Sequence, residues 1–417
     1  MKKKIKYLII LMSFVLLVFW GIKSTLEYFD ETYVHNSKMG QNIYIENINI
    51  SDITKEEVIS ILNEKIQVKD IVLNDKDKIY TIEASSIDLE YDTLSLIDKA
   101  YEYNKSDDIR QNIETFLELR DSKKEFNITP TYDEAKLSEE IERISNSINI
   151  TEVDATIHIS DYGAITRTPS RDGRELDIIS LKEDIYNIIK AKNHTEITLN
   201  VMDLIPRVTT EDVNSVNMVI GEYSTTFSTA NENRATNVEI AAKKTSDALI
   251  MPGEEFSYND LTGKRIASNG YKNAPVIING QLEDDVGGGV CQVSSTIFNT
   301  VMKAGLEVTS RRNHSLRVAY LPIGQDAMVV DNGSDFRFNN QYENPIYVKN
   351  TVVDGVLTSK IYGSLNDYKN IDIRVEPYLY EGLEAAKTYI DIKDASGNII
   401  ETRYIGNSVY NQPNTAT

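Results

Sequence analysis

The amino-acid sequence predicts an α+β fold built from several successive units. Three observations predict it. Residues 7–22 form one uncharged, strongly apolar run. Through residues 40–208, segments with apolar residues at helical spacing alternate with short strand-like segments. After about residue 366 the chain reads mainly as strands bounded by turn residues. We therefore expect an apolar helix, two mixed modules, a further α+β domain and a β-rich C-terminal extension.

The apolar run has the features of a membrane anchor. Four lysines stand among the first six residues, and Lys23 closes the run. Its length is close to the lower limit of about 17 residues for a spanning helix. A cleaved signal peptide is the alternative, yet the stretch FWGIKSTLEYF offers no small-residue cleavage site. We expect an uncleaved, single-pass anchor at 1–23 in the cell membrane, with the bulk of the chain outside the cytoplasm.

A polar stalk at 24–39 leads to two modules of similar order, at 40–125 and 126–208. In the first, IYIENINI precedes Thr54, which reads as a helix N-cap, and apolar residues follow at helical spacing. In the second, DGRELD precedes a helix of spaced leucines and isoleucines. This stretch resembles the peptidoglycan-binding module found beside cell-wall transpeptidases. A plain α+β spacer, which holds the next domain off the membrane, is the alternative.

Two helices are predicted in the domain at 209–365. The stretch NVEIAAKKTSDAL, residues 237–249, reads as a helix with Asn237 as its N-cap. The stretch VCQVSSTIFNTVMKA, residues 290–304, carries apolar residues on one face, and Gly305 is the stop signal. In the extension at 366–417, turn residues at 396–398 predict a β-hairpin.

Composition excludes one class of partner and directs attention to one residue. The net charge is −20 and no basic stripe is present, so we expect no nucleic-acid partner. Cys291 is the only cysteine and cannot form an intramolecular disulfide. In an exported chain such a cysteine is a reactive thiol or an intermolecular partner, unless it is simply buried and inert. The residues around Cys291 distinguish between these interpretations.

The neighbours of Cys291 favour a reactive thiol. Glycines 287–289 precede it and permit a close approach of another molecule. The predicted helix start places unpaired amides beside the sulfur, which lowers a thiol pKa and stabilises an oxyanion. His314, the sole histidine after residue 194, follows 23 residues later (314 minus 291), so we expect a thiol–imidazole pair. Asp326 is the first candidate to orient the imidazole and Asp331 the second; either can be an ordinary turn residue.

The segment DVGGGVCQVSSTIFNTVMKAGLEVTSRRNHSLRVAYLPIGQDAMV closely resembles the hallmark of VanW-domain proteins. The resemblance covers about residues 221–362. Some members of this family, anchored and preceded by peptidoglycan-binding-like modules, act as L,D-transpeptidases of the bacterial cell wall. The resemblance implies this role here, with Cys291 as nucleophile and His314 as base. The better-known L,D-transpeptidases carry an HGC motif that this chain lacks, so their fold is not carried over.

The resemblance thus implies a cysteine-dependent L,D-transpeptidase that forms 3-3 cross-links between peptidoglycan stem peptides through a thioester, with an L,D-carboxypeptidase side activity when water attacks the thioester. A Cys/His pair alone lacks the ligands of a zinc site, so we expect no metal, and the reaction needs no cofactor. The candidate residues for the oxyanion and for the stem carboxylates are Gly288, Gly289, Gln292, Arg234 and Arg312. Each arginine is equally plausible in a surface salt bridge. The alternative is a non-catalytic peptidoglycan-binding or scaffolding protein in which Cys291 merely packs.

Overall fold

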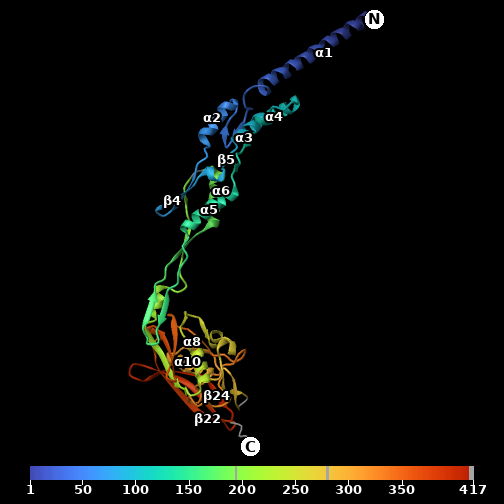
Figure 1. Ribbon diagram of the computed structural model, residues 1–417. Helices are drawn as coiled ribbons and strands as arrows, with labels where there is room; N and C mark the ends of the chain where they lie inside the picture. The colour runs from blue at the N-terminus through green and yellow to red at the C-terminus, as the bar shows by residue number, and fades with distance from the viewer. Residues whose placement is uncertain (193–194, 279–280, 413–417) are drawn as a thin grey trace. The chain divides into compact units, whose positions relative to one another are not determined.

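The structure is a computed structural model that describes residues 1–192, 195–278 and 281–412 (Figure 1). It mixes helices and strands, which confirms the α+β class, and its C-terminal residues are strand-rich as expected. The chain forms two compact units. One comprises Met1–Thr151 and Arg174–Leu204, and the other comprises Glu152–Gly173 and Ile205–Thr417.

Helices and strands of the first unit alternate along the sequence. Its helices are α1 (Lys2–Phe29), α2 (Lys55–Lys65), α3 (Thr93–Glu102), α4 (Ile109–Asp121), α5 (Glu134–Ile148) and α6 (Ile178–Ala191). Its strands are β1 (Ile43–Ile45), β2 (Ile48–Asn49), β3 (Ile71–Asp75), β4 (Lys78–Ile82), β5 (Glu90–Tyr91), β6 (Lys124–Phe126), β7 (Pro130–Thr131), β10 (Gly173–Leu176), β11 (Ile197–Thr198) and β12 (Val201–Leu204).

Strands dominate the second unit. Its helices are α7 (Thr210–Ser215), α8 (Glu232–Lys244), α9 (Tyr258–Thr262) and α10 (Val290–Ala304). Its strands are β8 (Thr156–Ile159), β9 (Ile165–Thr168), β13 (Met218–Thr226), β14 (Ala248–Ile250), β15 (Glu255–Ser257), β16 (Asn273–Ile278), β17 (Gln281–Val286), β18 (Glu307–Ser310), β19 (Arg337–Asn339), β20 (Ile346–Val353), β21 (Val356–Gly363), β22 (Asn370–Tyr380), β23 (Leu383–Lys393) and β24 (Ile399–Tyr410).

The N-terminal apolar run forms α1, a helix of 28 residues with no buried residue. Within the described part of the chain, Lys2–Val34 is the one helical segment long and apolar enough to cross a membrane, and a signal sequence passes the same test. The helix continues past Lys23 into the predicted stalk. At 1.5 Å per residue, α1 is about 42 Å long and exceeds a hydrocarbon core of about 30 Å.

Two apolar clusters form the interior of the first unit, and they interleave along the sequence. One gathers residues of β1, α2, α3 and α4. The other gathers β3, α5 and α6. β11 pairs in parallel with β3, with Ile197 opposite Leu73, which joins residues far apart in sequence. Residues 71–89 therefore share a core with residues 137–199, and the division into modules at 40–125 and 126–208 stays a prediction.

Helix α10 is the central element of the second unit (Figure 1). An antiparallel sheet in the order β13-β21-β20-β14 packs against it. Val293, Ile297 and Val301, predicted to share an apolar face, are all fully buried. Burial of such a side chain contributes about 1.5–3 kcal/mol. Gly221 of β13 permits the contact, because a Cβ there would lie 2.6 Å from the carbonyl oxygen of Thr300.

The sequence located α10 correctly and α8 only in part. α10 begins at Val290 and ends at a left-handed Gly305. α8, however, begins before Asn237, because Asn231 accepts the Arg234 amide and caps the helix. Asn237 is buried inside α8 and donates to the carbonyls of Lys272 and Gly288, both at 2.9 Å. In the sequence, an asparagine whose side chain bonds distant backbone cannot be told from an asparagine that caps a helix.

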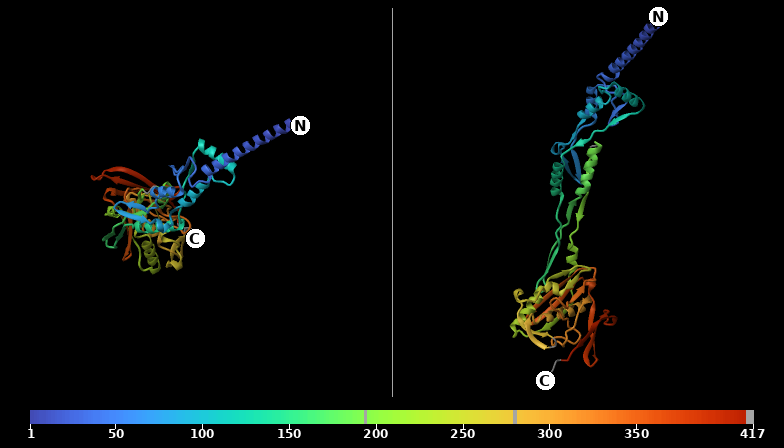
Figure 2. Two further views of the ribbon diagram at one scale, coloured as in Figure 1. Left: turned by 90° about the horizontal axis from the view of Figure 1, so that it is seen from above. Right: turned by 90° about the vertical axis from the view of Figure 1, so that its right-hand side faces the viewer.

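The C-terminal extension forms an antiparallel sheet, β22-β23-β24. The predicted hairpin is confirmed, because β23 pairs with β24 around residues 394–398. Ile371, Ile390 and Ile392 of this sheet join the apolar cluster that surrounds α10. Figure 2 shows these strands, at the red end of the chain, alongside the rest of the second unit. The extension is therefore part of the same folded unit as α10.

Candidate active site

Cys291 is the second residue of α10 and lies at the end of a glycine turn. Gly287 and Gly289 have φ of +91° and +106°, a conformation that favours glycine. Gly288 is required for space, because a Cβ there would meet the carbonyl oxygen of Ala274 at 2.4 Å. The turn brings the start of α10 against β16. It places Cys291, a half-buried residue, in the first turn of a helix, where amide dipoles favour a thiolate.

The thiol of Cys291 contacts two groups. Its Sγ lies 3.5 Å from the carbonyl oxygen of Val329, and the His314 side chain is close enough to stabilise its thiolate form. Burial raises the pKa of the Cys291 thiol, but hydrogen bonding and charge from His314, the Val329 backbone and the charge of Arg265 together lower this pKa by more than burial raises it. The net result is a pKa below the ordinary thiol value of 9.0. The site therefore favours the nucleophilic form of the sulfur.

His314 lies between the thiol and a carboxylate. It is 6% exposed, and its Nδ1 lies 2.6 Å from Oδ2 of Asp326. An aspartate oxygen accepts the Nδ1 hydrogen, so Nε2 is the nitrogen left to interact with sulfur. Burial lowers the pKa of His314, but the hydrogen bonds to Asp326 and Cys291 outweigh it and raise the pKa to about 10. This favours an imidazolium beside a thiolate.

Asp326 is a buried carboxylate, 1% exposed, with four donors. Oδ2 accepts the backbone N–H of His314 at 2.6 Å as well as its imidazole. Oδ1 accepts Nη2 of Arg311 at 3.2 Å and the hydroxyl of Tyr410 at 2.5 Å. Burial raises the pKa of Asp326, but the His314 bond and charge and the Arg311 charge bring it below its usual value. Asp326 is thus held ionised beneath the imidazole.

Asp331, the second candidate for this contact, has a different partner. Its Oδ1 lies 2.7 Å from Nε of Arg265, and its Oδ2 accepts the backbone N–H of Arg265 at 2.8 Å. Of the two aspartates considered from the sequence, Asp326 contacts His314. Asp331 instead fixes an arginine that lines the same cavity as the thiol.

Cys291 opens into a cavity of about 800 Å³. Among the residues predicted to bind substrate, Arg234 and Gly289 line it together with His314. Gly288, Gln292 and Arg312 do not belong to its lining. Arg312 is exposed at the surface.

Gln292 has a structural environment. It is 1% exposed. Its Nε2 donates to Thr225 Oγ1 and to the Thr226 carbonyl, each at 3.0 Å. Its Oε1 accepts Nη2 of Arg234 at 2.7 Å. Its backbone N–H donates to the carbonyl of Gly289 at 3.0 Å, so it is not available for an oxyanion.

Four residues of the site carry no local sequence signal: Arg265, Arg311, Tyr320 and Tyr410. Arg265 is 7% exposed, and within the described residues its Nη2 has no hydrogen-bond partner. Tyr320 lines the cavity, and burial raises the pKa of its hydroxyl, so the hydroxyl is neutral beside the thiol. Only the fold brings these residues to the site, because no motif spacing links them to Cys291.

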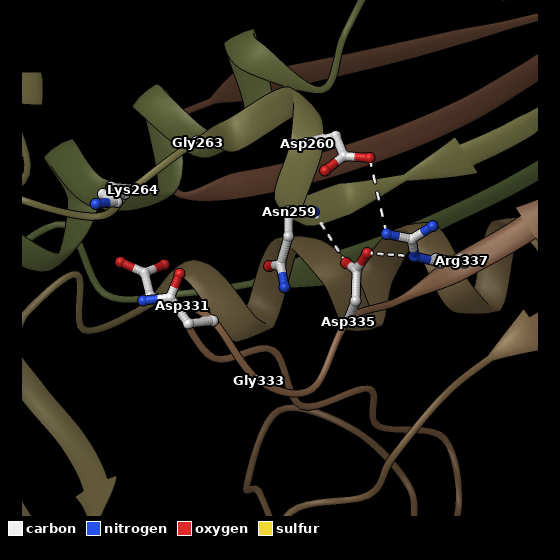
Figure 3. Close-up of a pocket in the computed structure, with 9 residues that line it drawn as sticks. Asn259, Asp260, Gly263, Lys264, Asp331, Gly333, Asp335 and Arg337 are labelled. Carbon is white, nitrogen blue, oxygen red and sulfur yellow. Dashed lines mark hydrogen bonds and ion pairs between the residues drawn. The ribbon is translucent and has the colours of Figure 1, made fainter.

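A second cavity, of about 430 Å³, is polar and adjoins Asp331 (Figure 3). Arg337 lies between Asp260 and Asp335 there, at 3.7 and 2.7 Å, and Asp335 also accepts the N–H of Asn259. These carboxylates are therefore paired. In the parts of the chain that the structure describes, no group of three or more His, Cys, Asp or Glu is placed to hold a metal ion.

Comparison with known proteins identifies the class to which this chain belongs. Residues 233–362 match the family model described as "VanW like protein", and residues 80–198 match that described as "Putative peptidoglycan binding domain". The first match contains Cys291, His314 and Asp326 and ends before β22.

The uncharacterized protein YoaR of Bacillus subtilis (strain 168) is 35% identical over 237 residues, which cover 57% of this chain and 77% of that protein. The vancomycin B-type resistance protein VanW of Enterococcus faecalis (strain ATCC 700802 / V583) is 27% identical over 136 residues, 31% of this chain and 50% of that protein. No solved structure matches. The chain belongs to the VanW-like family, and the two family matches indicate a cell-wall-related protein.

Proposed function

We propose that this protein is a cell-wall L,D-transpeptidase that forms 3-3 peptidoglycan cross-links through a cysteine thioester. One observation carries the proposal: the thiol of a half-buried cysteine at a helix start interacts with a buried imidazole, which a buried aspartate orients, at the wall of a large cavity. This is the arrangement of a nucleophile, a base and an orienting carboxylate. A purely structural cysteine has no need of an ionised partner.

In the first step the Cys291 thiolate attacks the carbonyl carbon of the third residue in a tetrapeptide stem. A carbon–sulfur bond forms and the carbonyl oxygen becomes an oxyanion. Collapse of the tetrahedral intermediate breaks the bond to the terminal D-alanine, and His314 gives its Nε2 proton to the leaving amine. The products are a thioester on Cys291 and free D-alanine. Asp326 keeps the imidazole oriented and balances its charge.

The oxyanion needs donors at the start of α10. The backbone N–H groups of Val290 and Gln292 donate to the carbonyls of Gly287 and Gly289, at 3.2 and 3.0 Å. We therefore assign the oxyanion to the N–H of Cys291 itself, with the dipole of α10 behind it. Gln292 then serves to fix Arg234, and its N–H plays no direct part.

Arg265 takes the place of Arg312 in the proposal for the stem carboxylate. Arg265 lines the cavity, its Nε and N–H are held by Asp331, and its Nη2 has no partner among the described residues. Arg234 lies on the same wall. Nη1 of Arg265 donates to Asn259 and Thr262, at 2.9 and 3.2 Å, so Nη2 is the nitrogen left for a carboxylate, and the fixed guanidinium binds it at low entropic cost.

In the second step a side-chain amine from a neighbouring stem attacks the thioester carbonyl. His314 takes one amine proton, a carbon–nitrogen bond forms, and the Cys291 thiolate leaves. Water in place of the amine gives an L,D-carboxypeptidase. We further propose that α1 anchors the chain, uncleaved, in the cytoplasmic membrane, and that the first unit binds peptidoglycan, in keeping with the match over residues 80–198.

The test uses the purified full-length chain in detergent with muropeptides that carry tetrapeptide stems. We expect a mass adduct on the peptide containing Cys291, equal to the stem less one D-alanine, and 3-3 linked product. Cys291→Ala removes both, and His314→Gln reduces product at least about a hundredfold. Ser310→Ala, a similar small change on β18, serves as control. A wild-type protein without adduct or product favours the non-catalytic scaffold instead.

A further inference from the structure

We propose that Tyr410, near the C-terminal end of the chain, is a positioning residue for His314 and Asp326. The β22-β23-β24 sheet is then a working part of the active site. This inference rests on the proposed function, because it concerns the same thiol. It goes beyond the family match, which ends at residue 362. Tyr410 reaches neither the thiol nor the cavity and acts through the carboxylate.

Tyr410 fixes the orientation of the Asp326 carboxylate. Its hydroxyl donates to Oδ1 at 2.5 Å, and the same oxygen accepts Arg311. Both bonds to His314 use the other oxygen, Oδ2. Rotation of the Asp326 carboxylate about its Cβ–Cγ bond would break the hydrogen bonds of both oxygens. A donor on Oδ1 therefore holds Oδ2 against the imidazole. Bonds from a hydroxyl to an ionised carboxylate are short and strong.

The hydroxyl of Tyr410 is itself fixed and stays protonated. It accepts the backbone N–H of Gly324 at 2.9 Å, two residues before Asp326. Burial and the Asp326 charge raise the pKa of Tyr410 to about 12. The phenol therefore remains a donor through the physiological pH range. Tyr410 is 2% exposed, so water does not compete for the carboxylate.

The backbone of β24 holds the segment on either side of His314. Asn313 donates from Nδ2 to the carbonyl of Val409 at 2.8 Å. On the other side, the N–H of Asn411 donates to the carbonyl of Ser315 at 2.7 Å. His314 is thus fixed at both flanks by the residues that flank Tyr410.

Two further bonds join the sheet to residues near the same carboxylate. Nη1 of Arg311 donates to Ser408 Oγ at 2.8 Å, and this arginine reaches Asp326 through Nη2. From β23, Thr388 Oγ1 donates to the carbonyl of Gly324 at 2.9 Å. A sheet that only covered apolar surface would not need polar bonds concentrated on residues 311–326. Their concentration points to a positioning role.

The test measures Cys291 alkylation by iodoacetamide against pH in the full-length protein, read by mass spectrometry. Tyr410→Phe keeps the ring and removes the hydroxyl. A carboxylate free to rotate holds the imidazolium less well, so the alkylation midpoint rises by about half a pH unit or more. In cross-linking assays kcat falls about three- to tenfold while KM stays within about twofold, because no substrate contact is lost.

Tyr378→Phe is the matched control. It removes a tyrosine hydroxyl from the same sheet, bonded at 2.7 Å to Asn407, with no bond to residues 311–326 among those described. It should leave the midpoint and kcat unchanged. Should Tyr410→Phe not fold, as judged by circular dichroism, Ser408→Ala tests the same point through Arg311 and should shift the midpoint in the same direction.

The outcomes separate this inference from the proposed function. A wild-type midpoint well below 9.0 that rises in Tyr410→Phe and not in Tyr378→Phe supports positioning. A low wild-type midpoint unchanged in both Tyr410→Phe and Ser408→Ala overturns the role of Tyr410 and leaves the nucleophile intact. A wild-type midpoint at the ordinary thiol value overturns both proposals.

Discussion

Helices α1 and α10 are both rich in apolar residues, yet their surroundings are opposite. α1 has no buried residue, whereas 13 of the 15 residues of α10 are buried. The buried set of α10 includes polar residues, and each of Ser294, Ser295 and Thr296 has a hydrogen-bond partner. Residues 7–22 of α1 are uncharged and apolar on all sides, which suits a lipid phase. Apolar content alone therefore does not distinguish a core helix from a candidate membrane span; the placement of polar side chains does.

The largest expected effect comes from the core of α10. Ile297→Ala should lower the free energy of unfolding by about 2–5 kcal/mol, because Ile297 is fully buried and leaves a cavity. Urea unfolding followed by circular dichroism measures it. Leu16→Ala in α1 is the control and should change this free energy by less than about 0.5 kcal/mol. Equal effects from both variants would contradict the contrast between the helices.

A charge placed in α1 should act on membrane association instead. Leu16→Lys should disfavour insertion by about 2.5–3.5 kcal/mol, the cost of a lysine at the centre of a spanning helix. Tyr28→Lys, near the polar end of α1, should have little effect. The fraction of protein that sediments with membranes measures this, and the intact mass shows whether residues 1–22 are retained. Unchanged sedimentation of Leu16→Lys, or a chain that lacks these residues, would argue against an anchor.

Serines in the two helices give a matched pair. Ser13 and Ser295 both donate to a carbonyl four residues earlier, at 2.9 and 2.7 Å. Ser295 also accepts the N–H of Ala327 at 2.9 Å, beside Asp326. Ser295→Ala should therefore cost about 1–3 kcal/mol, because a buried donor loses its partner. Ser13→Ala should have no measurable effect in the same unfolding assay, and a loss from it as large as from Ser295→Ala would contradict this account.

The smallest effect is a pH dependence that the pair of Cys291 in α10 and His314 should confer. The pKa of His314 is raised on folding from 6.5 to about 10, so His314 stabilises the fold below 6.5 and loses this contribution as pH rises to 10. The pKa of Cys291 is lowered from 9.0, so its contribution is complete above 9.0 and is lost as pH falls through its folded value.

At pH values below 9 and above both 6.5 and the folded pKa of Cys291, a folded thiolate–imidazolium pair and an unfolded thiol with neutral imidazole bind the same number of protons. The unfolding free energy should be flat there and should fall between pH 9 and about 10. In Cys291→Ala the fall should start near 6.5, because only the histidine titrates. Urea unfolding across this range measures both curves, and coincident curves would exclude the ion pair.

The sequence was sufficient for features that depend on neighbouring residues. The bounds of α10 followed from apolar periodicity and a stop glycine, and the C-terminal hairpin followed from its turn residues. Asp326 came first among two candidates because GQDAMV predicts a strand that begins there. That strand is wrong, since residues 326–330 form none in the structure, and the choice over Asp331 needed the structure. Asn237 gave a wrong start for α8, because its side chain forms hydrogen bonds with backbone that is distant in sequence.

Features that depend on long-range pairing could not be predicted. Nothing near Tyr410 points to a carboxylate 84 residues earlier. The Nη2 of Arg265, which lacks a hydrogen-bond partner among the described residues, and the interleaved apolar clusters of the first unit likewise result from tertiary contacts. A pattern read along one segment reports the face that the segment buries, and it does not report what lies opposite that face.

Gly288 has a consequence for how this site can vary. The start of α10 and the backbone of β16 lie so close that a single methyl group would not fit between them. Pro275 and Val276 of β16 line the cavity that contains the thiol. Any displacement of that wall must therefore displace the sulfur as well. The dimensions of the cavity and the position of the Cys291 sulfur therefore depend on one another. If the protein is the proposed transpeptidase, a wider donor stem has to be accommodated by side-chain exchange on a fixed backbone.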